Sequence, residues 1–357
     1  MTNKVVHLVP SFGCGGLEKV IVNLINNSSH LNLEHVIISL TDELTMKDQL
    51  TLPIEIISLN KKPGNDISTH FKLFSLLRKM KPIALQSYNF ATLEYHFIAK
   101  LAGVKKLIHS DHGRGGDHPE GKNKLHNFLR YLVGRVVNHY VVVSHDLKKW
   151  VIESILIPEK KVSLVFNGVK INKNISASVK NPINFISVGR LDPVKNQTLM
   201  IESFVEAINE GLIDSNSVLR VVGDGPSRKV LENIIEQLNA SNYVVLLGYQ
   251  ADVESFLLKS DAFLLSSVYE AMPMTILEAM ANKIPVLCTD VGGISQFISD
   301  ESAWISPSKD KQTYKNYLGD LQKNEVERLD KINTAYDLVC EKYSIETMVD
   351  RYCGFYQ

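Results

Sequence analysis

Short apolar runs alternate with amphipathic helical stretches along almost the whole chain. Helical patterns such as 17–26, 71–80, 93–101 and 124–133 separate the runs of the first half. Parallel strands need helical crossovers, and a sheet covered on both faces is built from apolar strands. The alternation therefore predicts a mostly parallel sheet with helices on both faces. The runs expected to be strands are 5–10, 35–40, 54–58, 83–87, 106–110, 140–144 and 162–166.

The alternation stops once and then restarts. Residues 170–184 (KINKNISASVKNPIN) have no periodicity and are rich in Asn, Ser and Lys, which indicates a linker. Further strand-like runs follow at 185–188, 218–222, 244–247, 262–265 and 286–288, and a final helical pattern at 332–357 breaks near Tyr343. We therefore expect an α/β fold with two successive doubly wound domains, and we expect ligands to bind in the cleft between them.

Composition narrows the class of protein. The 357 residues are 45% hydrophobic, which is enough for two cores, and 39 basic residues balance 39 acidic ones, so nothing predicts a nucleic-acid partner. The four cysteines lack paired spacing and read as reduced thiols. No apolar run approaches the length of a signal-peptide core or a membrane span. These features predict a cytoplasmic protein whose membrane contact, if any, is peripheral.

Two glutamates in the second half, Glu270 and Glu278, are separated by seven residues. Glu270 follows the apolar run 262–265, and Pro273 opens the helix that carries Glu278 in its second turn. Ligands of open α/β sheets bind at the carboxyl ends of strands, where a helix N-terminus favours an anion. Two carboxylates beside such a helix suit a ligand with hydroxyls and phosphates, such as a nucleotide sugar. Taken singly, each glutamate also reads as a solvated surface charge.

Two cations follow the first strand of the second half, in the segment Gly189-Arg190-Leu191-Asp192-Pro193-Val194-Lys195. Arginine grips phosphate oxygens as a fork, and lysine supplies a point charge. Together Arg190 and Lys195 could neutralise a departing diphosphate without a metal ion. The alternative is a helix start with ordinary surface cations.

Three glycine turns close neighbouring strands of the second half. Gly223-Asp224-Gly225-Pro226 is a tight turn that shapes the expected site, although a turn without ligand contact competes with that interpretation. Backbone at Gly248-Tyr249 could meet a nucleobase. The segment 289–293 (TDVGG) is expected to be structural support.

The first half carries weaker signals. Gly13-Cys14-Gly15-Gly16 precedes a helix, but Glu18 replaces the third glycine of the dinucleotide fingerprint, which argues against NAD. Backbone at Gly16 can still approach a diphosphate. His112 follows a strand end, and this position favours function over a purely structural role. The basic segment 122–135 could rest on anionic lipid, with an ordinary surface helix as the slightly preferred interpretation.

Together, Gly15-Gly16, Gly189-Arg190 with Lys195, the 223–226 turn, the E-x7-E pair and the TDVGG turn closely resemble retaining glycosyltransferase family 4. The resemblance spans nearly the whole chain and implies the GT-B fold, with two facing Rossmann-like domains. It implies an acceptor-binding domain at 1–170, a linker at 171–184, a donor-binding domain at 185–340, and a helix at 341–357 that crosses back. The stretch 110–123 (SDHGRGGDHPEGKN) further resembles bacterial members that build exopolysaccharide, capsule or O-antigen.

By this resemblance, Arg190 and Lys195 hold the donor diphosphate, Glu278 the ribose hydroxyls, and Glu270 the donor sugar. Glu270, His112, Arg190 and Lys195 form the expected catalytic set. The expected donor-binding residues are Gly16, Arg190, Lys195, Gly223, Tyr249, Glu270, Ala271, Met272, Pro273, Met274, Thr275 and Glu278. Ala271 departs from the family pattern, which usually has glycine there, and Lys170 stands where an acid is common.

The sequence thus predicts transfer of a hexose or N-acetylhexosamine, most simply from a UDP-sugar, with an α-linkage and no metal or other cofactor. The expected acceptor is a lipid-linked oligosaccharide at the inner membrane face. Two other functions stay open: a GT-B-fold nucleotide-sugar epimerase, and a non-catalytic nucleotide-sugar-binding subunit of an assembly complex.

Overall fold

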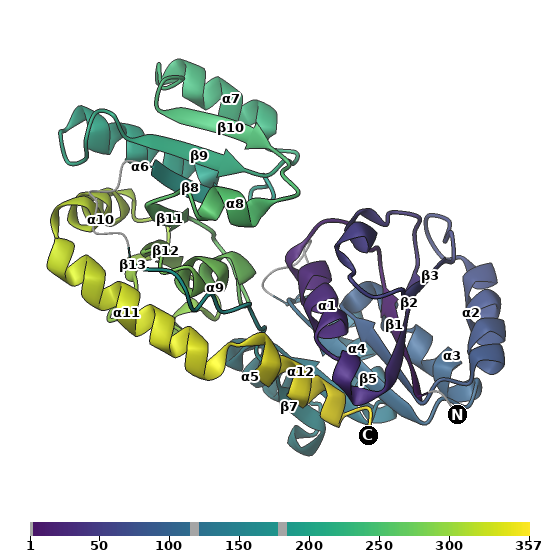
Figure 1. Ribbon diagram of the computed structural model, residues 1–357. Coiled ribbons are helices and arrows are strands. Elements are labelled where there is room, and N and C mark those ends of the chain that lie inside the picture. The colour runs from purple at the N-terminus through teal and green to yellow at the C-terminus, as the bar shows by residue number, and fades with distance from the viewer. Residues whose placement is uncertain (1–2, 115–120, 178–183) are drawn as a thin grey trace. The chain divides into compact units, whose positions relative to one another are not determined.

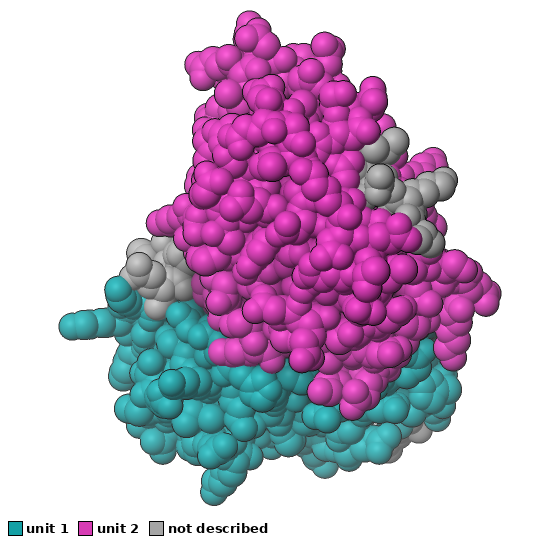
Figure 2. Space-filling model, turned by 90° about the vertical axis from the view of Figure 1, so that its left-hand side faces the viewer, with its two compact units in different colours: residues 1–168, 345–357 teal, residues 169–344 magenta. Residues whose placement is uncertain are grey.

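The chain folds into two compact units, each built around its own parallel sheet. The computed structural model describes residues 3–114, 121–177 and 184–357. Unit 1 comprises Met1–Gly168 and Ile345–Gln357, and unit 2 comprises Val169–Ser344 (Figures 1 and 2). Residues 178–183 of the expected linker lie outside the described residues, and 171–177 belong to unit 2.

Unit 1 contains a seven-stranded sheet in the order β3-β2-β1-β4-β5-β6-β7, with every neighbouring pair parallel. The strand order reverses between β1 and β4, as in doubly wound folds. The strands are β1 (Asn3–Val9), β2 (Leu33–Ser39), β3 (Glu55–Ser58), β4 (Ala84–Tyr88), β5 (Lys106–Asp111), β6 (His139–Val142) and β7 (Val162–Leu164). The helices are α1 (Gly16–Asn26), α2 (Ile67–Met80), α3 (Tyr95–Leu101), α4 (Lys124–Val136), α5 (His145–Glu153) and α12 (Ile345–Gly354).

The last helix is an integral part of unit 1. It packs against α1, and Tyr352 and Tyr356 are almost fully buried. The ammonium of Lys106 at the start of β5 donates to the backbone oxygen of Tyr356, with an N–O distance of 3.2 Å. The C-terminal residues therefore complete the core of the unit that begins the chain.

Unit 2 contains a six-stranded parallel sheet in the order β10-β9-β8-β11-β12-β13. A cluster of buried apolar side chains, including Phe185, Phe204 and Leu264, forms its core. The strands are β8 (Asn184–Val188), β9 (Val218–Val222), β10 (Val244–Gly248), β11 (Ala262–Leu265), β12 (Val286–Asp290) and β13 (Trp304–Pro307). The helices are α6 (Gln197–Asn209), α7 (Arg228–Gln237), α8 (Val253–Leu257), α9 (Met274–Ala281), α10 (Lys311–Lys323) and α11 (Glu325–Lys342).

The predicted alternation is confirmed, with one omission in the sheet of unit 2. Strand β13 is only four residues long and ends in Pro307, so its sequence resembles a loop. It pairs with β12 from Leu287↔Trp304 onward. The predicted break near Tyr343 is also found, since α11 ends at Lys342 and α12 begins at Ile345. Among the described residues, every helix is too short or too polar to cross a membrane.

Candidate functional site

The candidate site of unit 2 lies at the carboxyl ends of two adjacent strands, β8 and β11. The loop after β8 carries Lys195, and the loop after β11 carries Glu270. The ammonium nitrogen of Lys195 lies 2.5 Å from Oε1 of Glu270. Glu270 is buried, whereas the Lys195 side chain is 26% exposed. The structure thus brings these two predicted residues together and leaves the lysine accessible to a ligand.

The two loops are also joined through their backbones. The amide of Val268 donates to the carbonyl of Val194 at 2.8 Å. The hydroxyl of Ser266 contacts the carbonyls of Lys195 and Asn196 at 3.0 and 2.9 Å. These contacts fix the strand-end loops relative to each other before any ligand binds, which lowers the entropy that ordering the site would cost.

Glu270 is held from two further sides. The hydroxyl of Ser267 donates to its Oε1 at 2.7 Å, and the amide of Gly293 donates to its carbonyl at 3.0 Å. Gly292 adopts a positive φ of 58°, and a Cβ placed there would collide with the Glu270 carbonyl. The hydroxyl of Thr289 bonds the Ser267 carbonyl at 2.6 Å. The TDVGG turn, expected only to be structural support, thus lies directly against the backbone of Glu270.

Arg190 is anchored by an aspartate to which the sequence interpretation assigned no role. Oδ2 of Asp192 lies 2.7 Å from both Nε and Nη2 of Arg190, and this carboxylate is almost buried. Oδ1 of Asp192 accepts the amides of Val194 and Lys195 at 3.0 and 3.2 Å. The Arg190 side chain is 71% exposed, so its guanidinium is accessible to solvent. An aspartate whose side chain accepts hydrogen bonds from the amides of the second and third following residues forms an Asx-type turn. The Asp192-Pro193 sequence is typical of such a turn and could have predicted this role of Asp192.

The helix that carries Glu278 begins where it was expected. Pro273 is the N-cap residue of α9, and Ala271, Met272 and Met274 are buried around it. In this described part of unit 2, no side chain caps the helix, so its first amides are available to an anion. Thr275 and Glu278 are partly exposed on the same helix.

Glycines allow close backbone approach where β8 and β9 end. Gly223 has a φ of 132°, and a Cβ there would collide with the carbonyl of Gly189. Its amide donates to the carbonyl of Gly248 at 2.8 Å, which ties the ends of β9 and β10 together. Tyr249, next in the chain, is 46% exposed. The 223–226 turn therefore holds the ends of β8, β9 and β10 close together, and its part in shaping a ligand site stays a prediction.

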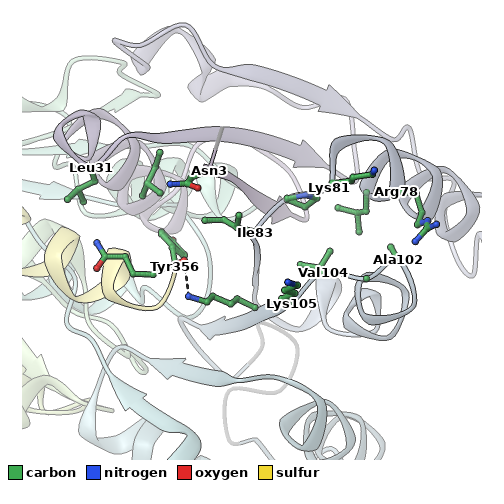
Figure 3. A pocket seen from close by; sticks show the side chains of 15 residues that line it. Asn3, Leu31, Arg78, Lys81, Ile83, Ala102, Val104, Lys105 and Tyr356 are labelled. Atoms are coloured by element: carbon green, nitrogen blue, oxygen red, sulfur yellow. Dashed lines mark hydrogen bonds between the residues drawn. The ribbon is translucent and has the colours of Figure 1, made fainter. Parts of the chain in front are cut away.

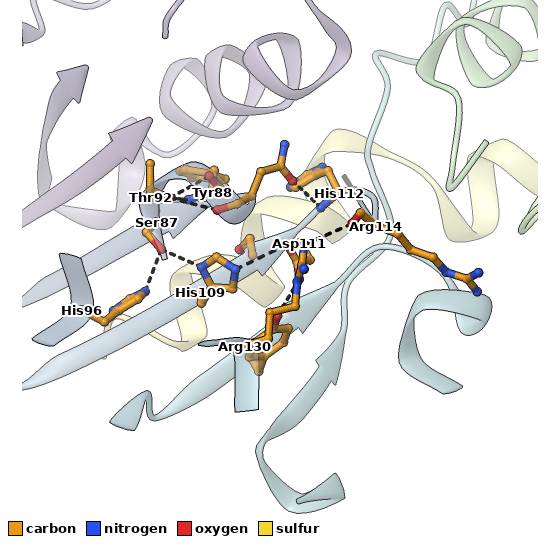
Figure 4. Close-up of polar contacts among 12 residues, drawn as sticks. Ser87, Tyr88, Thr92, His96, His109, Asp111, His112, Arg114 and Arg130 are labelled. Atoms are coloured by element: carbon orange, nitrogen blue, oxygen red, sulfur yellow. Dashed lines mark hydrogen bonds and ion pairs between the residues drawn. The ribbon is translucent and has the colours of Figure 1, made fainter. Parts of the chain in front are cut away.

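In unit 1, His112 follows β5 and is partly buried. Its amide donates to Oδ1 of Asn89 at 2.9 Å, and among the described residues its Nε2 has no hydrogen-bond partner (Figure 4). Burial lowers the pKa of His112 to about 4, although the neighbouring Asp111 works in the opposite direction. His112 is consequently neutral at physiological pH, and its Nε2 is a buried ring nitrogen whose hydrogen-bonding capacity is not used within the described residues.

A buried polar network supports β5, the strand that ends directly before His112. Asp111 is fully buried, and its Oδ2 accepts from Nε of Arg130 at 3.0 Å and from the Tyr140 hydroxyl at 2.5 Å (Figure 4). Burial alone would raise the pKa of Asp111. The charge of Arg130 and contacts with His109 and Tyr140 outweigh it and hold that pKa below its ordinary value. The hydroxyl of Ser87 lies 2.7 Å from both His96 and His109, which extends the network.

Gly16 is the first residue of α1 and is exposed, as an anion-binding helix start requires. The carboxylate of Glu18 lies close to Gly15, and that of Glu43 lies close to Gly13. Burial is the main cause that raises the pKa of Glu18 to about 7, and the nearby Glu43 adds to it. Glu18, which in the sequence is only a departure from the NAD pattern, is therefore a titratable group beside these glycines.

The basic segment 122–135 corresponds to α4, while residues 115–120 of the stretch before it lie outside the described residues. Within 3–114, 121–177 and 184–357, no group of three or more His, Cys, Asp or Glu residues is arranged to hold a metal ion.

Two family models match the chain almost end to end. The model described as Glycosyltransferase Family 4 matches residues 14–173, and the one described as Glycosyl transferases group 1 matches residues 169–337. The chain belongs to glycosyltransferase family 4. These matches meet near the boundary of the two units, at Gly168 and Val169.

Curated relatives of this family 4 chain include bacterial sugar transferases. An Escherichia coli UDP-Gal:alpha-D-GlcNAc-diphosphoundecaprenol alpha-1,3-galactosyltransferase is 27% identical over 66% of this chain and 65% of its own length. A Campylobacter jejuni diphospho-undecaprenol 4-alpha-N-acetylgalactosaminyltransferase is 23% identical over 78% and 79%. The chain spans 65%, 57% and 64% of the length of three similar relatives.

Solved structures show the same fold. HepE of Anabaena in complex with UDP superposes with a TM-score of 0.83 at 17% identity, covering 98% of each chain. The lipopolysaccharide outer core galactosyltransferase WaaB superposes with a TM-score of 0.74 at 20% identity, covering 99% of this chain and 98% of WaaB. The two Rossmann-like units of this family 4 member are thus those of the GT-B fold, as predicted.

Proposed function

We propose that this protein is a retaining glycosyltransferase that transfers a hexose or N-acetylhexosamine from a UDP-sugar to a lipid-linked saccharide. Membership of family 4 supports the transferase class. The UDP complex of HepE and the UDP-Gal donor in the name of the E. coli relative support the donor base. That relative and its C. jejuni counterpart both name a diphosphoundecaprenol-linked acceptor and an alpha linkage.

The observation that carries the proposal is the arrangement of Arg190, Lys195 and Glu270 at the ends of β8 and β11. The loops after these strands carry two accessible cations and one buried carboxylate, and α9 begins four residues after Glu270 with no side-chain cap from Pro273. A nucleotide sugar presents the complementary groups, a diphosphate for the cations and helix amides and sugar hydroxyls for the carboxylate.

The ammonium of Lys195 can bind the donor diphosphate and Glu270 at the same time. Its ammonium has three N–H donors, and Glu270 accepts one of them, so phosphate oxygens can accept others. Arg190 is fixed by Asp192 through Nε and Nη2 and can offer its remaining guanidinium N–H groups to the diphosphate. As the bond from the sugar to the diphosphate breaks, negative charge grows on the leaving oxygen, and these preorganised cations stabilise it without a metal ion.

We propose front-face displacement. The acceptor hydroxyl attacks the anomeric carbon from the side that the diphosphate leaves, and its proton passes to the departing phosphate oxygen. The α configuration of the donor is then retained. Glu270 positions the donor sugar, Glu278 the ribose, and His112 of unit 1 acts as a neutral hydrogen-bonding group on the reacting sugar. The backbone of Ala271–Thr275 with Gly16, Gly223 and Tyr249 completes the proposed donor set.

A thermal-shift panel of UDP, GDP and ADP sugars tests the donor assignment, with Glu278→Ala as the site variant and Glu325→Ala on α11 as the control. At a hundredfold excess over the dissociation constant, a bound ligand stabilises the folded state by about 2.7 kcal/mol. We expect UDP-sugars to stabilise wild type and Glu325→Ala but not Glu278→Ala. Stabilisation by another nucleotide series, or equal stabilisation of Glu278→Ala, would overturn the assignment.

A further inference from the structure

One outer face of unit 1 consists of helices that carry no acidic residue. The sequences of α2 (ISTHFKLFSLLRKM), α3 (YHFIAKL) and α4 (KLHNFLRYLVGRV) contain neither Asp nor Glu. The chain as a whole has as many acidic as basic residues, so this absence is a local property. These helices carry six exposed cations: Lys72, Arg78, Lys79, Lys100, Lys124 and Arg135.

The same helices expose large apolar side chains. Among the described residues, fourteen large hydrophobic side chains are exposed, and half of them lie on these three helices. Phe71 and Leu101 are each 72% exposed. On α2 the exposed apolar side chains recur at i, i+4 and i+7, and on α3 at i and i+4, which aligns each set along one side of its helix. The seven are Ile67, Phe71, Phe74, Phe97, Leu101, Leu125 and Phe128.

These helices are neighbours, so their exposed side chains share one surface. The His70 ring of α2 lies 4.8 Å from the Tyr95 ring of α3, and α2 and α3 lie side by side in Figure 1. Helix α3 also contacts α4. We name this surface, formed by α2, α3 and α4, the basic apolar face. A buried core does not require exposed phenylalanines, and a face that is both apolar and cationic calls for a partner with both properties.

A cavity opens beside the carboxyl ends of α2 and α3. It has a volume of about 750 Å³ (Figure 3) and lies where β1, β2, β4 and β5 begin. His112 follows the other end of β5. Its charged side chains are all cations, namely Arg78, Lys81, Lys105 and Lys106. Ala102 in its wall directly follows the exposed Leu101. The cavity therefore borders the basic apolar face, and its four cations suit it to a phosphate group.

We propose that the basic apolar face docks onto a bilayer of anionic lipids, with the exposed phenylalanines and leucines entering the headgroup region and the cavity receiving a lipid phosphate. Charge complementarity selects this occupant, because the face offers six exposed cations against one exposed acid at its edge, Glu94, which directly precedes α3 and lies 3.5 Å from the His70 ring. Apolar insertion together with basic attraction is the combination that gives stable peripheral binding. The proposal extends the proposed function, since a lipid-linked acceptor must be met at a membrane, but its test reads membrane binding alone.

Sedimentation with vesicles tests the docking. The full chain is mixed with vesicles of phosphatidylethanolamine and phosphatidylglycerol, or with phosphatidylcholine vesicles as the neutral reference. We expect wild type to prefer the anionic vesicles, and Phe71→Ser/Phe97→Ser to lower its partition coefficient at least about tenfold. Leu258→Ser/Val326→Ser removes exposed apolar side chains from unit 2 and should bind as wild type.

Two charge-reversal variants measure how much the cations of the face contribute to vesicle binding. Lys79→Glu/Lys100→Glu alters the last turns of α2 and α3, and Lys323→Glu/Lys342→Glu alters the last turns of α10 and α11. We expect the first pair to abolish the preference for anionic vesicles and the second to leave it unchanged. Folding of each variant is checked by its melting curve.

Three results would overturn the proposal: absence of binding by wild type, equal loss in face and control variants, or unchanged binding by the face variants. Light scattering tests whether the basic apolar face binds a second copy of this chain instead of a membrane. A wild-type dimer that Phe71→Ser/Phe97→Ser converts to a monomer, with vesicle binding unchanged, would make the face an interface between copies of this chain. UDP-sugar binding measured on the same variants separates a failed membrane proposal from a failed donor assignment.

Discussion

The ammonium nitrogen of Lys195 lies 2.5 Å from Oε1 of Glu270, although the two residues are 75 positions apart in the chain. The parallel pairing of β8 with β11 makes this contact possible, because it places the two strand-end loops side by side. The pair thus connects the cation assigned to the donor diphosphate with the carboxylate assigned to the donor sugar.

Removing the lysine charge should weaken donor binding. In Lys195→Met the diphosphate loses a charge-assisted hydrogen bond, a loss of about 1.5–3 kcal/mol, or roughly ten- to a hundredfold in dissociation constant. Lys311→Met, which breaks a surface ion pair with Glu206 in the same unit, is the control. Titration calorimetry with a UDP-sugar measures both. Equal affinities for the two variants would exclude Lys195 from the donor site.

Replacing Gly292 should lower the stability of the fold for two reasons, its contact with the Glu270 carbonyl and its positive φ angle. In Gly292→Ala the new methyl group meets the Glu270 carbonyl, and we expect a loss of about 3–4 kcal/mol in the free energy of unfolding. Gly211→Ala is a matched control, because Gly211 has a similar φ of 68° with nothing within 4 Å of its added Cβ. Its expected cost is only about 1–2 kcal/mol, from the angle alone. Urea denaturation measures both variants. Equal losses in the free energy of unfolding would show that the contact with Glu270 adds nothing to the cost of the backbone angle.

Breaking the buried pair of Asp111 and Arg130 should destabilise unit 1 strongly. Arg130→Met leaves the Asp111 carboxylate buried without its main counter-charge, a change that typically costs about 3–5 kcal/mol. Arg114→Met breaks the more exposed pair with Asp146 and should cost about 1 kcal/mol or less. Thermal unfolding compares them, and similar melting temperatures would show that the Asp111 network contributes little.

Acid should destabilise the fold from about pH 6.5 downward. Burial is the main cause that lowers the pKa of His35 and His112 to about 4, and it also holds the pKa of His7 and His96 well below the ordinary value. The unfolded chain takes up these protons near pH 6.5 while the folded protein does not, so stability is lost as pH falls. Each such histidine adds a slope of up to about 1.4 kcal/mol per pH unit. A free energy of unfolding that is flat between pH 7.5 and 5 would contradict this expectation.

Glu18 should act in the opposite direction. Its pKa of about 7 in the folded protein exceeds the unfolded value, so the folded state loses stability as pH rises from about 4.5 to 7. Glu18→Gln should therefore be more stable than wild type by about 1–3 kcal/mol at pH 8 and nearly equal to it at pH 4. Glu43→Gln, at a more exposed neighbour, provides the control. A difference between Glu18→Gln and wild type that does not change with pH would contradict the shifted pKa.

Two features of the protein could be predicted from the sequence: the two parallel sheets and the sheet edge at which the candidate site lies. Alternating apolar runs predicted both sheets, and the rule that ligands bind at carboxyl strand ends brought Lys195 and Glu270 to the same edge. The contact of Gly292 with Glu270 could not be predicted, because it joins segments whose spacing is set by packing. Arg130 was likewise hidden, since on a basic helix it resembles a surface charge until the fold places Asp111 beside it. Strand β13 was missed because Pro307 made it resemble a loop.

The measurement that tests the central claim most directly is transfer from a radiolabelled UDP-sugar to polyprenyl-diphosphate-linked saccharides, with product anomers assigned by NMR. We predict label in the lipid-linked fraction only when acceptor is present, an α-linked product, activity that persists in EDTA, and loss of activity in Glu270→Gln. Conversion of the nucleotide sugar without acceptor would show an epimerase instead. Tight UDP-sugar binding without any transfer would contradict the transferase assignment and favour a binding subunit.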